Sequence, residues 1–86
     1  MDKYEYVRFS AKLLVKKKTT MTALDLVKEL NYRNFSSNRG EAFVGRQGIY
    51  KLISSTHKRL VDSGNQEDAD EVARAFTKQD GSYAYN

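Results

Sequence analysis

The sequence predicts a small, mainly α-helical domain of about four helices with a minor two-stranded β element. Apolar residues recur at helical spacing in four separate stretches, whereas β-prone residues are confined to two short runs, at 19–21 and 82–85. A chain of 86 residues suffices for one hydrophobic core. No internal repeat or low-complexity tract divides it, so residues 1–86 are expected to form a single domain.

The first predicted helix covers residues 3–17. Its expected inner face contains Tyr6, Val7, Ser10, Ala11, Leu13 and Leu14. Its expected outer face contains Glu5, Arg8, Lys12 and Lys16, of which the first three are spaced to pair with one another along the helix. Lysines 16–18 follow at the negative end of the macrodipole, either as a solvated helix end or as a phosphate clamp.

The second predicted helix begins at Thr22, after a short β-prone segment at 19–21. Asp25 stands three residues beyond Thr22 and completes a weak capping box. The apolar residues that follow at i, i+3, i+4 and i+7 are Ala23, Leu26, Val27 and Leu30. We expect this helix to pack in the core and to support the next one.

The segment Asn31 to Gly45 has no periodicity and is long for a connection in a small domain. It combines three aromatic residues, Tyr32, Phe35 and Phe43, with arginines at 33, 39 and 46 in or just after it. One interpretation is a loop anchored by its aromatic rings that carries arginines to a phosphate backbone. The other is that the rings only close the end of the core.

The longest predicted helix, residues 46–63, has two distinct faces. Its apolar face contains Ile49, Leu52, Ile53, Thr56 and Leu60. The opposite face contains Gln47, Tyr50, Lys51, Ser54 and Lys58, with Ser55 at its edge. This second face is cationic, rich in hydrogen-bonding groups and free of carboxylates, which is typical of a helix that contacts DNA.

A fourth helix is predicted over residues 66–78, after Gly64 as the C′ residue and Asn65 as the N-cap. Its expected inner residues are Ala69, Val72, Ala73 and Phe76, and its first turns contain Glu67, Asp68, Asp70 and Glu71. We expect this acidic helix to face away from DNA. Asp80-Gly81 predicts a turn, after which Ser82 to Tyr85 is expected to pair with Thr19 to Met21.

The charge of the chain is divided along its length. Residues 1–60 contain 13 Lys or Arg against 5 Asp or Glu, a balance of +8, and residues 61–86 contain 2 against 6, a balance of −4. A cationic region of this kind attracts polyanions such as nucleic acid, although a merely solvated surface is the alternative.

Several classes of chemistry are not indicated. The chain has no cysteine and one histidine, so neither a disulfide nor a structural metal is expected. No nucleotide-binding or metalloprotease motif occurs, and no Ser, Cys or Asp stands at a spacing from His57 that suggests a catalytic triad. We therefore expect neither a cofactor nor an enzyme. The sequence has neither a membrane-length apolar run nor a signal peptide, which favours a soluble cytoplasmic protein, associated with the nucleoid if it binds DNA.

Residues 3–64 resemble the winged helix-turn-helix superfamily of DNA-binding domains. The resemblance rests on TTMTALDLVKELN, similar to its first strand and second helix, and on GRQGIYKLISSTHKRLVDSG, similar to its recognition helix. It implies that the helix at 46–63 enters the major groove, with Gln47, Tyr50, Lys51 and Ser54 at base edges and Ser55 and Lys58 nearer the phosphates. The chain departs from the pattern in its long connection before this helix and in the helical segment at the place of the wing.

The function predicted from the sequence is therefore double-stranded DNA binding by a transcriptional or mobile-element regulator. The predicted contact residues are Arg39, Arg46, Gln47, Tyr50, Lys51, Ser54, Ser55 and Lys58. An alternative is a protein-interaction module that uses Tyr4, Tyr50, Tyr83 and Tyr85 together with the acidic fourth helix. A minor alternative is RNA binding through the G-x-x-G segment Gly45 to Gly48, and self-association as a homodimer is also open.

Overall fold

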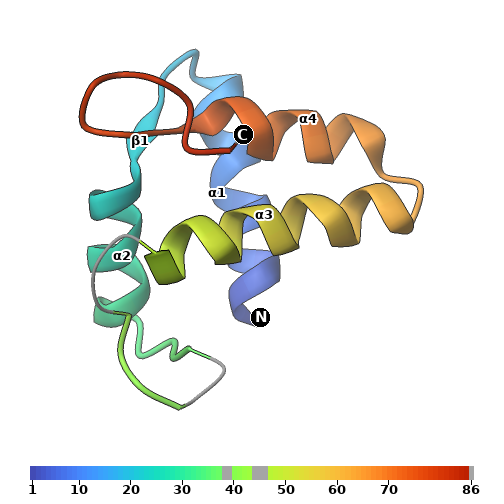
Figure 1. Cartoon of the computed structure of the whole chain (residues 1–86). Helices are drawn as coiled ribbons and strands as arrows, with labels where there is room; N and C mark the ends of the chain where they lie inside the picture. The colour runs from blue at the N-terminus through green and yellow to red at the C-terminus, as the bar shows by residue number, and fades with distance from the viewer. Residues whose placement is uncertain (38–39, 44–46, 86) are drawn as a thin grey trace.

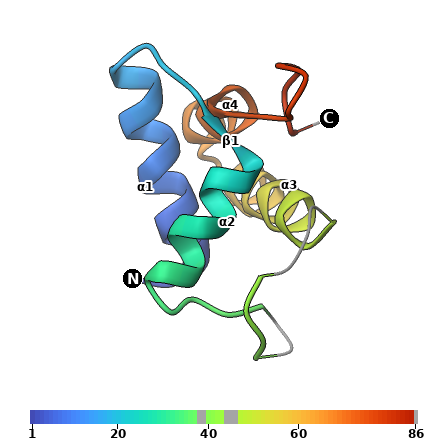
Figure 2. The same cartoon turned by 90° about the vertical axis from the view of Figure 1, so that its left-hand side faces the viewer.

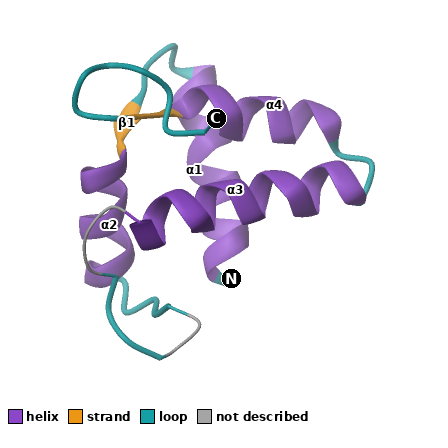
Figure 3. Cartoon of the chain, in the orientation of Figure 1, coloured by secondary structure: helices purple, strands orange, loops and turns teal. Residues whose placement is uncertain are grey.

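The computed structural model describes residues 1–37, 40–43 and 47–85, without the side chain of Gln47. It is mainly helical with a small β element, as predicted (Figure 1, Figure 3). The elements are α1 (Lys3–Lys16), β1 (Met21–Thr22), α2 (Ala23–Tyr32), α3 (Gln47–Asp62), α4 (Gln66–Ala75) and β2 (Phe76–Thr77). No helix in the described ranges has the length and apolar character needed to cross a membrane.

Helices α3 and α4 form an antiparallel pair, and α1 crosses behind them (Figure 1). Helix α4 packs against both α1 and α3, while α2 stands to one side, near the first turn of α3 (Figure 2). The largest fully buried side chains come from every helix and from β2, and they are Val7, Leu26, Leu30, Ile49, Ile53, Thr56, Val72 and Phe76. One core therefore holds all the elements together.

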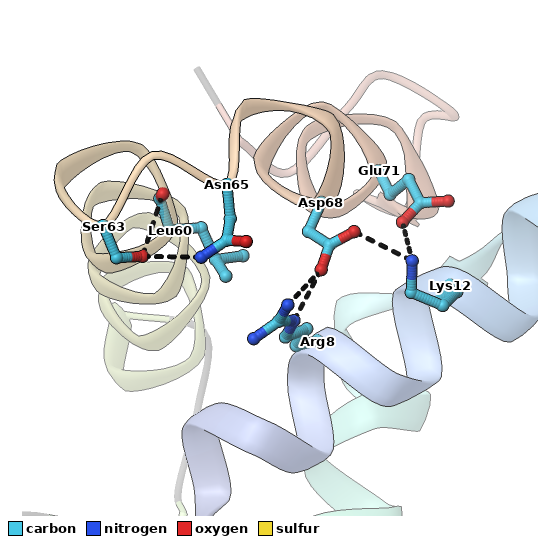
Figure 4. Close-up of polar contacts among 7 residues, drawn as sticks. All are labelled: Arg8, Lys12, Leu60, Ser63, Asn65, Asp68 and Glu71. Atoms are coloured by element: carbon cyan, nitrogen blue, oxygen red, sulfur yellow. Dashed lines mark hydrogen bonds and ion pairs between the residues drawn. The ribbon is translucent and has the colours of Figure 1, made fainter.

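Local capping chemistry explains several of the described helix ends. The Asp25 amide donates to Thr22 Oγ1 at 3.2 Å, so the predicted N-cap of α2 is confirmed. Gly64, after α3, has φ +81°, a conformation that glycine adopts without steric cost. Asn65 is the N-cap residue of α4, as predicted, but its side chain makes no capping hydrogen bond; its Nδ2 donates to Ser63 Oγ at 2.9 Å (Figure 4).

The predicted pairing of Ser82–Tyr85 with Thr19–Met21 is also wrong. Helix α4 ends at Ala75 rather than at 78, and β2 pairs in parallel with β1 in the register Met21 with Phe76. Because the fully buried Phe76 holds β2 beside β1, the segment after the Asp80-Gly81 turn folds back onto β2. The Ala84 amide donates to the Phe76 carbonyl at 2.9 Å, and Thr77 forms an antiparallel bridge with Tyr83.

Two residues of the predicted outer face of α1, Arg8 and Lys12, contact α4, whereas Glu5 and Lys16 are exposed. Arg8 Nε and Nη2 lie 2.6 and 2.5 Å from Asp68 Oδ2, and Lys12 Nζ lies 2.8 Å from Asp68 Oδ1 and 3.1 Å from Glu71 Oε1 (Figure 4). Both carboxylate side chains are only 12% exposed. The prediction that Glu5, Arg8 and Lys12 pair with one another along α1 is therefore wrong, because both cations pair with carboxylates of α4.

The orientation of α1 also makes its set of buried apolar residues differ from the predicted one. Val7 and Ala11 are fully buried, as expected, but Leu13 is 38% exposed and Phe9 is 50% exposed. The expectation that Leu13 belongs to the inner stripe is therefore wrong. The ion pairs with α4 occupy one side of α1, and Phe9 and Leu13 lie on a neighbouring side that is exposed.

Candidate nucleic-acid interface

The inner face of α3 agrees with the helical spacing of the sequence. Ile49, Leu52, Ile53, Thr56 and Leu60 are all buried. Thr56 is accommodated in the core because its Oγ1 donates to the Leu52 carbonyl at 2.7 Å, which satisfies the buried hydroxyl. The opposite side of α3 is thereby directed away from the core.

The predicted contact residues on α3 divide into two groups. Lys51, Ser54 and Lys58 are exposed and one or two turns apart, so they share a face. Tyr50 and Ser55 are half-buried, and Tyr50 packs against the core. Gln47 begins the helix, but its side chain lies outside the described part of the chain, as do Arg39 and Arg46.

The two lysines of this face are not equivalent. Lys58 Nζ lies 2.9 Å from Asp62 Oδ2, one turn further along α3, and this hydrogen bond raises the pKa of Lys58. Among the described residues, Lys51 makes no such ion pair. The charge of Lys58 is therefore partly compensated, whereas that of Lys51 is available to an approaching anion.

The C-terminal segment lies against the same side of α3. Lys78 Nζ stands 5.6 Å from the ring centre of Tyr50, and the Tyr85 ring stacks on His57 with centres 4.0 Å apart. A shallow depression beside this stack is lined by Ser54, His57, Lys58, Val61, Asp62 and Tyr85. The segment thus adds a cation, Lys78, and hydrogen-bonding groups to the edge of the α3 face.

Sequence reasoning missed the contribution of Lys78. The Asp80-Gly81 turn and the alternation after it predict a chain reversal, and Gly81 has φ +88° in the structure. They do not indicate which helix the reversed segment covers. That position depends on β2 pairing with β1, a contact between distant parts of the chain.

The connection before α3 is anchored by two of its three aromatic residues. Phe43 is buried, and its backbone N–H and C=O both bond to the side-chain amide of Asn31, at 2.8 and 2.9 Å. Phe35 packs on Tyr6 with ring centres 5.4 Å apart. Tyr32 is 84% exposed and anchors nothing. The predicted anchoring is confirmed for Phe43 and Phe35 only.

Arg33, one of the three arginines of this connection, is already engaged. Its Nε lies 3.5 Å from Glu29 Oε2, and its guanidinium stands 5.1 Å from the ring centre of Tyr6. These contacts raise its pKa, chiefly through Tyr6. Arg33 therefore belongs to the α1–α2 surface.

The surface expected for a protein-interaction module is smaller than the sequence indicates. Of its four tyrosines only Tyr83 is exposed, while Tyr4, Tyr50 and Tyr85 are half-buried. Arg59 covers the Tyr4 ring at 3.9 Å. Two of the four carboxylates at the start of α4 are turned toward α1, which leaves Glu67 and Asp70 exposed.

No group of three or more His, Cys, Asp or Glu side chains able to hold a metal ion occurs in the described residues. Comparison of the chain with protein-family models, with characterised proteins and with solved structures gave no significant match.

Proposed function

We propose that this chain is a small DNA-binding protein of winged-helix type that contacts duplex DNA with the exposed face of α3. The observation that supports this most is the exposed pair Lys51 and Ser54, on a helix whose one acidic residue, Asp62, lies in the last turn. An α-helix fits the major groove, where a lysine can bond guanine or a phosphate and a serine hydroxyl can both donate and accept.

The arrangement of charges elsewhere favours the same proposal. The carboxylates of Asp68 and Glu71 are held against α1 by Arg8 and Lys12, so they are neutralised inside the domain. These carboxylates consequently reduce the positive electrostatic potential over α3 only slightly. Lys78, beside Tyr50, provides a further positive charge at the edge of the face and could contact the DNA backbone.

With DNA binding we also propose a regulatory role, in transcription or in a mobile element. This role rests only on the small size of the domain and on its proposed mode of binding. A small domain that contacts DNA with one helix acts by occupying a site on DNA. The alternative of a protein-interaction module retains one specific observation, the exposed ring of Tyr83.

Binding to random-sequence duplexes tests the proposal. The protein is freed of nucleic acid with nuclease and titrated into labelled duplexes of increasing length at several salt concentrations, with anisotropy as the readout. We expect length-dependent binding that weakens as salt rises, because lysines release counterions from phosphates.

Lys51→Ala and Lys28→Ala form a matched pair of variants. Both remove an exposed lysine from a helix, Lys51 from α3 and Lys28 from α2. Lys51→Ala should lower the slope of log affinity against log salt by about 0.9, the value for one lost phosphate contact, and Lys28→Ala should not. Equal losses would refute the assignment of α3, and the absence of length-dependent binding would favour the interaction module.

A further inference from the structure

The outer face of α1 exposes two large apolar side chains one turn apart. Phe9 is 50% exposed and Leu13 is 38% exposed, and Met1, just before the helix, is 71% exposed. They border a groove between α1 and α2 whose other apolar lining includes Tyr6, Leu14, Met21 and Phe35. Single exposed apolar residues are ordinary, but a contiguous apolar strip beside a groove is typical of an interface.

The same face carries opposite charges at its two ends. Asp2 and Glu5 lie at its start, and Lys16 and Lys17 lie at its end, all with exposed side chains. At 3.6 residues per turn, Glu5, Phe9, Leu13 and Lys16 fall within an arc of about 80°. The face is therefore acidic, then apolar, then basic along the helix axis.

We propose that a second copy of this chain packs on this face, with the two α1 helices antiparallel. Phe9 and Leu13 are equally far in sequence from Ala11, and so are Glu5 and Lys17. A two-fold axis at the level of Ala11 therefore places Phe9 of one copy beside Leu13 of the other, and Glu5 beside the end of α1 that carries Lys16 and Lys17. Such an isologous contact satisfies both charged ends at once.

The charge pattern selects this occupant. An unrelated acidic helix would complement the lysines of α1 but would repel Asp2 and Glu5, and a basic one would do the reverse. A second α1 in antiparallel orientation complements both ends, because each end meets its opposite. The apolar centre supplies the area that is removed from water.

The position of α1 leaves the proposed DNA surface accessible. In Figure 2, α1 forms one edge of the molecule, and α3 and the C-terminal segment lie on the other side of α2. Dimer formation through α1 therefore does not cover Lys51 or Ser54. The dimer does not depend on the proposed function, since its test is the mass of the protein in the absence of DNA.

Charge reversal on the two ends of α1 tests the antiparallel arrangement. Sedimentation velocity should give the wild-type chain twice the mass of its 9.9 kDa monomer. Glu5→Lys alone and Lys16→Glu/Lys17→Glu together should each give monomers, because residue 5 then meets a like charge at the C-terminal end of the partner α1 in both symmetric contacts. An equimolar mixture of these two variants should associate, because the contacts between them are again attractive, and this association should weaken with salt.

Two further variants serve as controls. Lys28→Glu reverses an exposed charge on α2 and should remain a dimer. Phe9→Asp should weaken association about thirtyfold or more, as loss of a central apolar contact does, with an unchanged far-UV circular dichroism spectrum. A wild-type monomer at every concentration, a mixture that does not associate, or a Phe9→Asp protein that dimerises like wild type would overturn the proposal.

Discussion

Helices α3 and α1 direct their polar faces toward different surroundings. On α3, Lys51 and Ser54 are exposed to solvent, as the helical spacing predicts. On α1, Arg8 and Lys12 point into α4 and hold Asp68 and Glu71 there. Periodicity thus locates the apolar face of a helix, but it does not tell whether the polar face meets water or a second polar face of opposite charge.

This difference changes the meaning of the charge division between residues 1–60 and 61–86. Three of the cations in the first region, Arg8, Lys12 and Lys58, are paired with carboxylates of the second. The positive charge available to a polyanion is accordingly smaller than the count for residues 1–60. It includes the exposed Lys51, which makes this helix face the natural place to test binding.

The largest expected loss of stability comes from the apolar C-terminal end of α4, in contrast to the ion-paired N-terminal end. Phe76 follows α4 directly and is fully buried. Phe76→Ala should lower the free energy of unfolding by about 3–5 kcal/mol, because it removes a core ring and leaves a cavity. Urea unfolding measures this loss. If Asp68→Ala proved more damaging, the ion pairs rather than the core would be the main support of α4.

Asp68→Ala should have the next largest effect. It leaves Arg8 without its carboxylate partner and Lys12 with Glu71 alone. Because both cations are about half exposed, we expect the free energy of unfolding to fall by about 1–3 kcal/mol. Asp70→Ala, an exposed carboxylate in the same helix, should change stability by less than about 0.5 kcal/mol. Equal effects of the two substitutions would show that the α1–α4 ion pairs contribute nothing specific.

The pH dependence of stability provides a second measure of this interface. The hydrogen bond from Lys12, together with Arg8, lowers the pKa of Asp68 from its ordinary value of 3.8. A lowered folded-state pKa contributes stability that is fully present above the unfolded-state pKa and is lost as pH falls through the folded-state pKa. As pH falls below about 3.8, the melting temperature should therefore decline less steeply for Asp68→Asn than for wild type. Identical declines would contradict the assignment.

A smaller effect is expected where the C-terminal segment covers α3. Tyr85→Ala removes the ring stacked on His57 and should cost about 0.5–1.5 kcal/mol. Tyr85→Phe keeps the ring and should be nearly neutral. The His57 ring protons, followed by NMR, should shift only in the alanine variant. A phenylalanine variant as unstable as the alanine one would mean that the hydroxyl, and not the stack, holds the segment.

The parts of the fold that the sequence predicts are those set by neighbouring residues. The Thr22 cap bonds an amide three residues away, and the inner face of α3 follows from its own spacing. The contacts that escape prediction join distant residues. Arg8 and Asp68 are 60 residues apart, and a two-residue strand has too little β-propensity of its own to reveal that Met21 pairs with Phe76.

The candidate site divides in the same way. The exposure of Lys51 and Ser54 follows from helix geometry alone. The ion pair of Lys58 with Asp62 is also predictable from the sequence, since the two residues stand four apart on one helix. The partial burial of Tyr50 was not, because it depends on the core and on Lys78, which only the folded chain brings beside it.

The most direct test of the central claim is backbone NMR of the ¹⁵N-labelled protein during titration with a short random duplex. If the exposed face of α3 is the contact surface and the α1–α4 interface is internal, the largest amide shifts should fall at Lys51, Ser54 and Lys78 and leave α4 unchanged. Shifts centred on Glu67 and Asp70, or none along α3 at saturating duplex, would contradict the account.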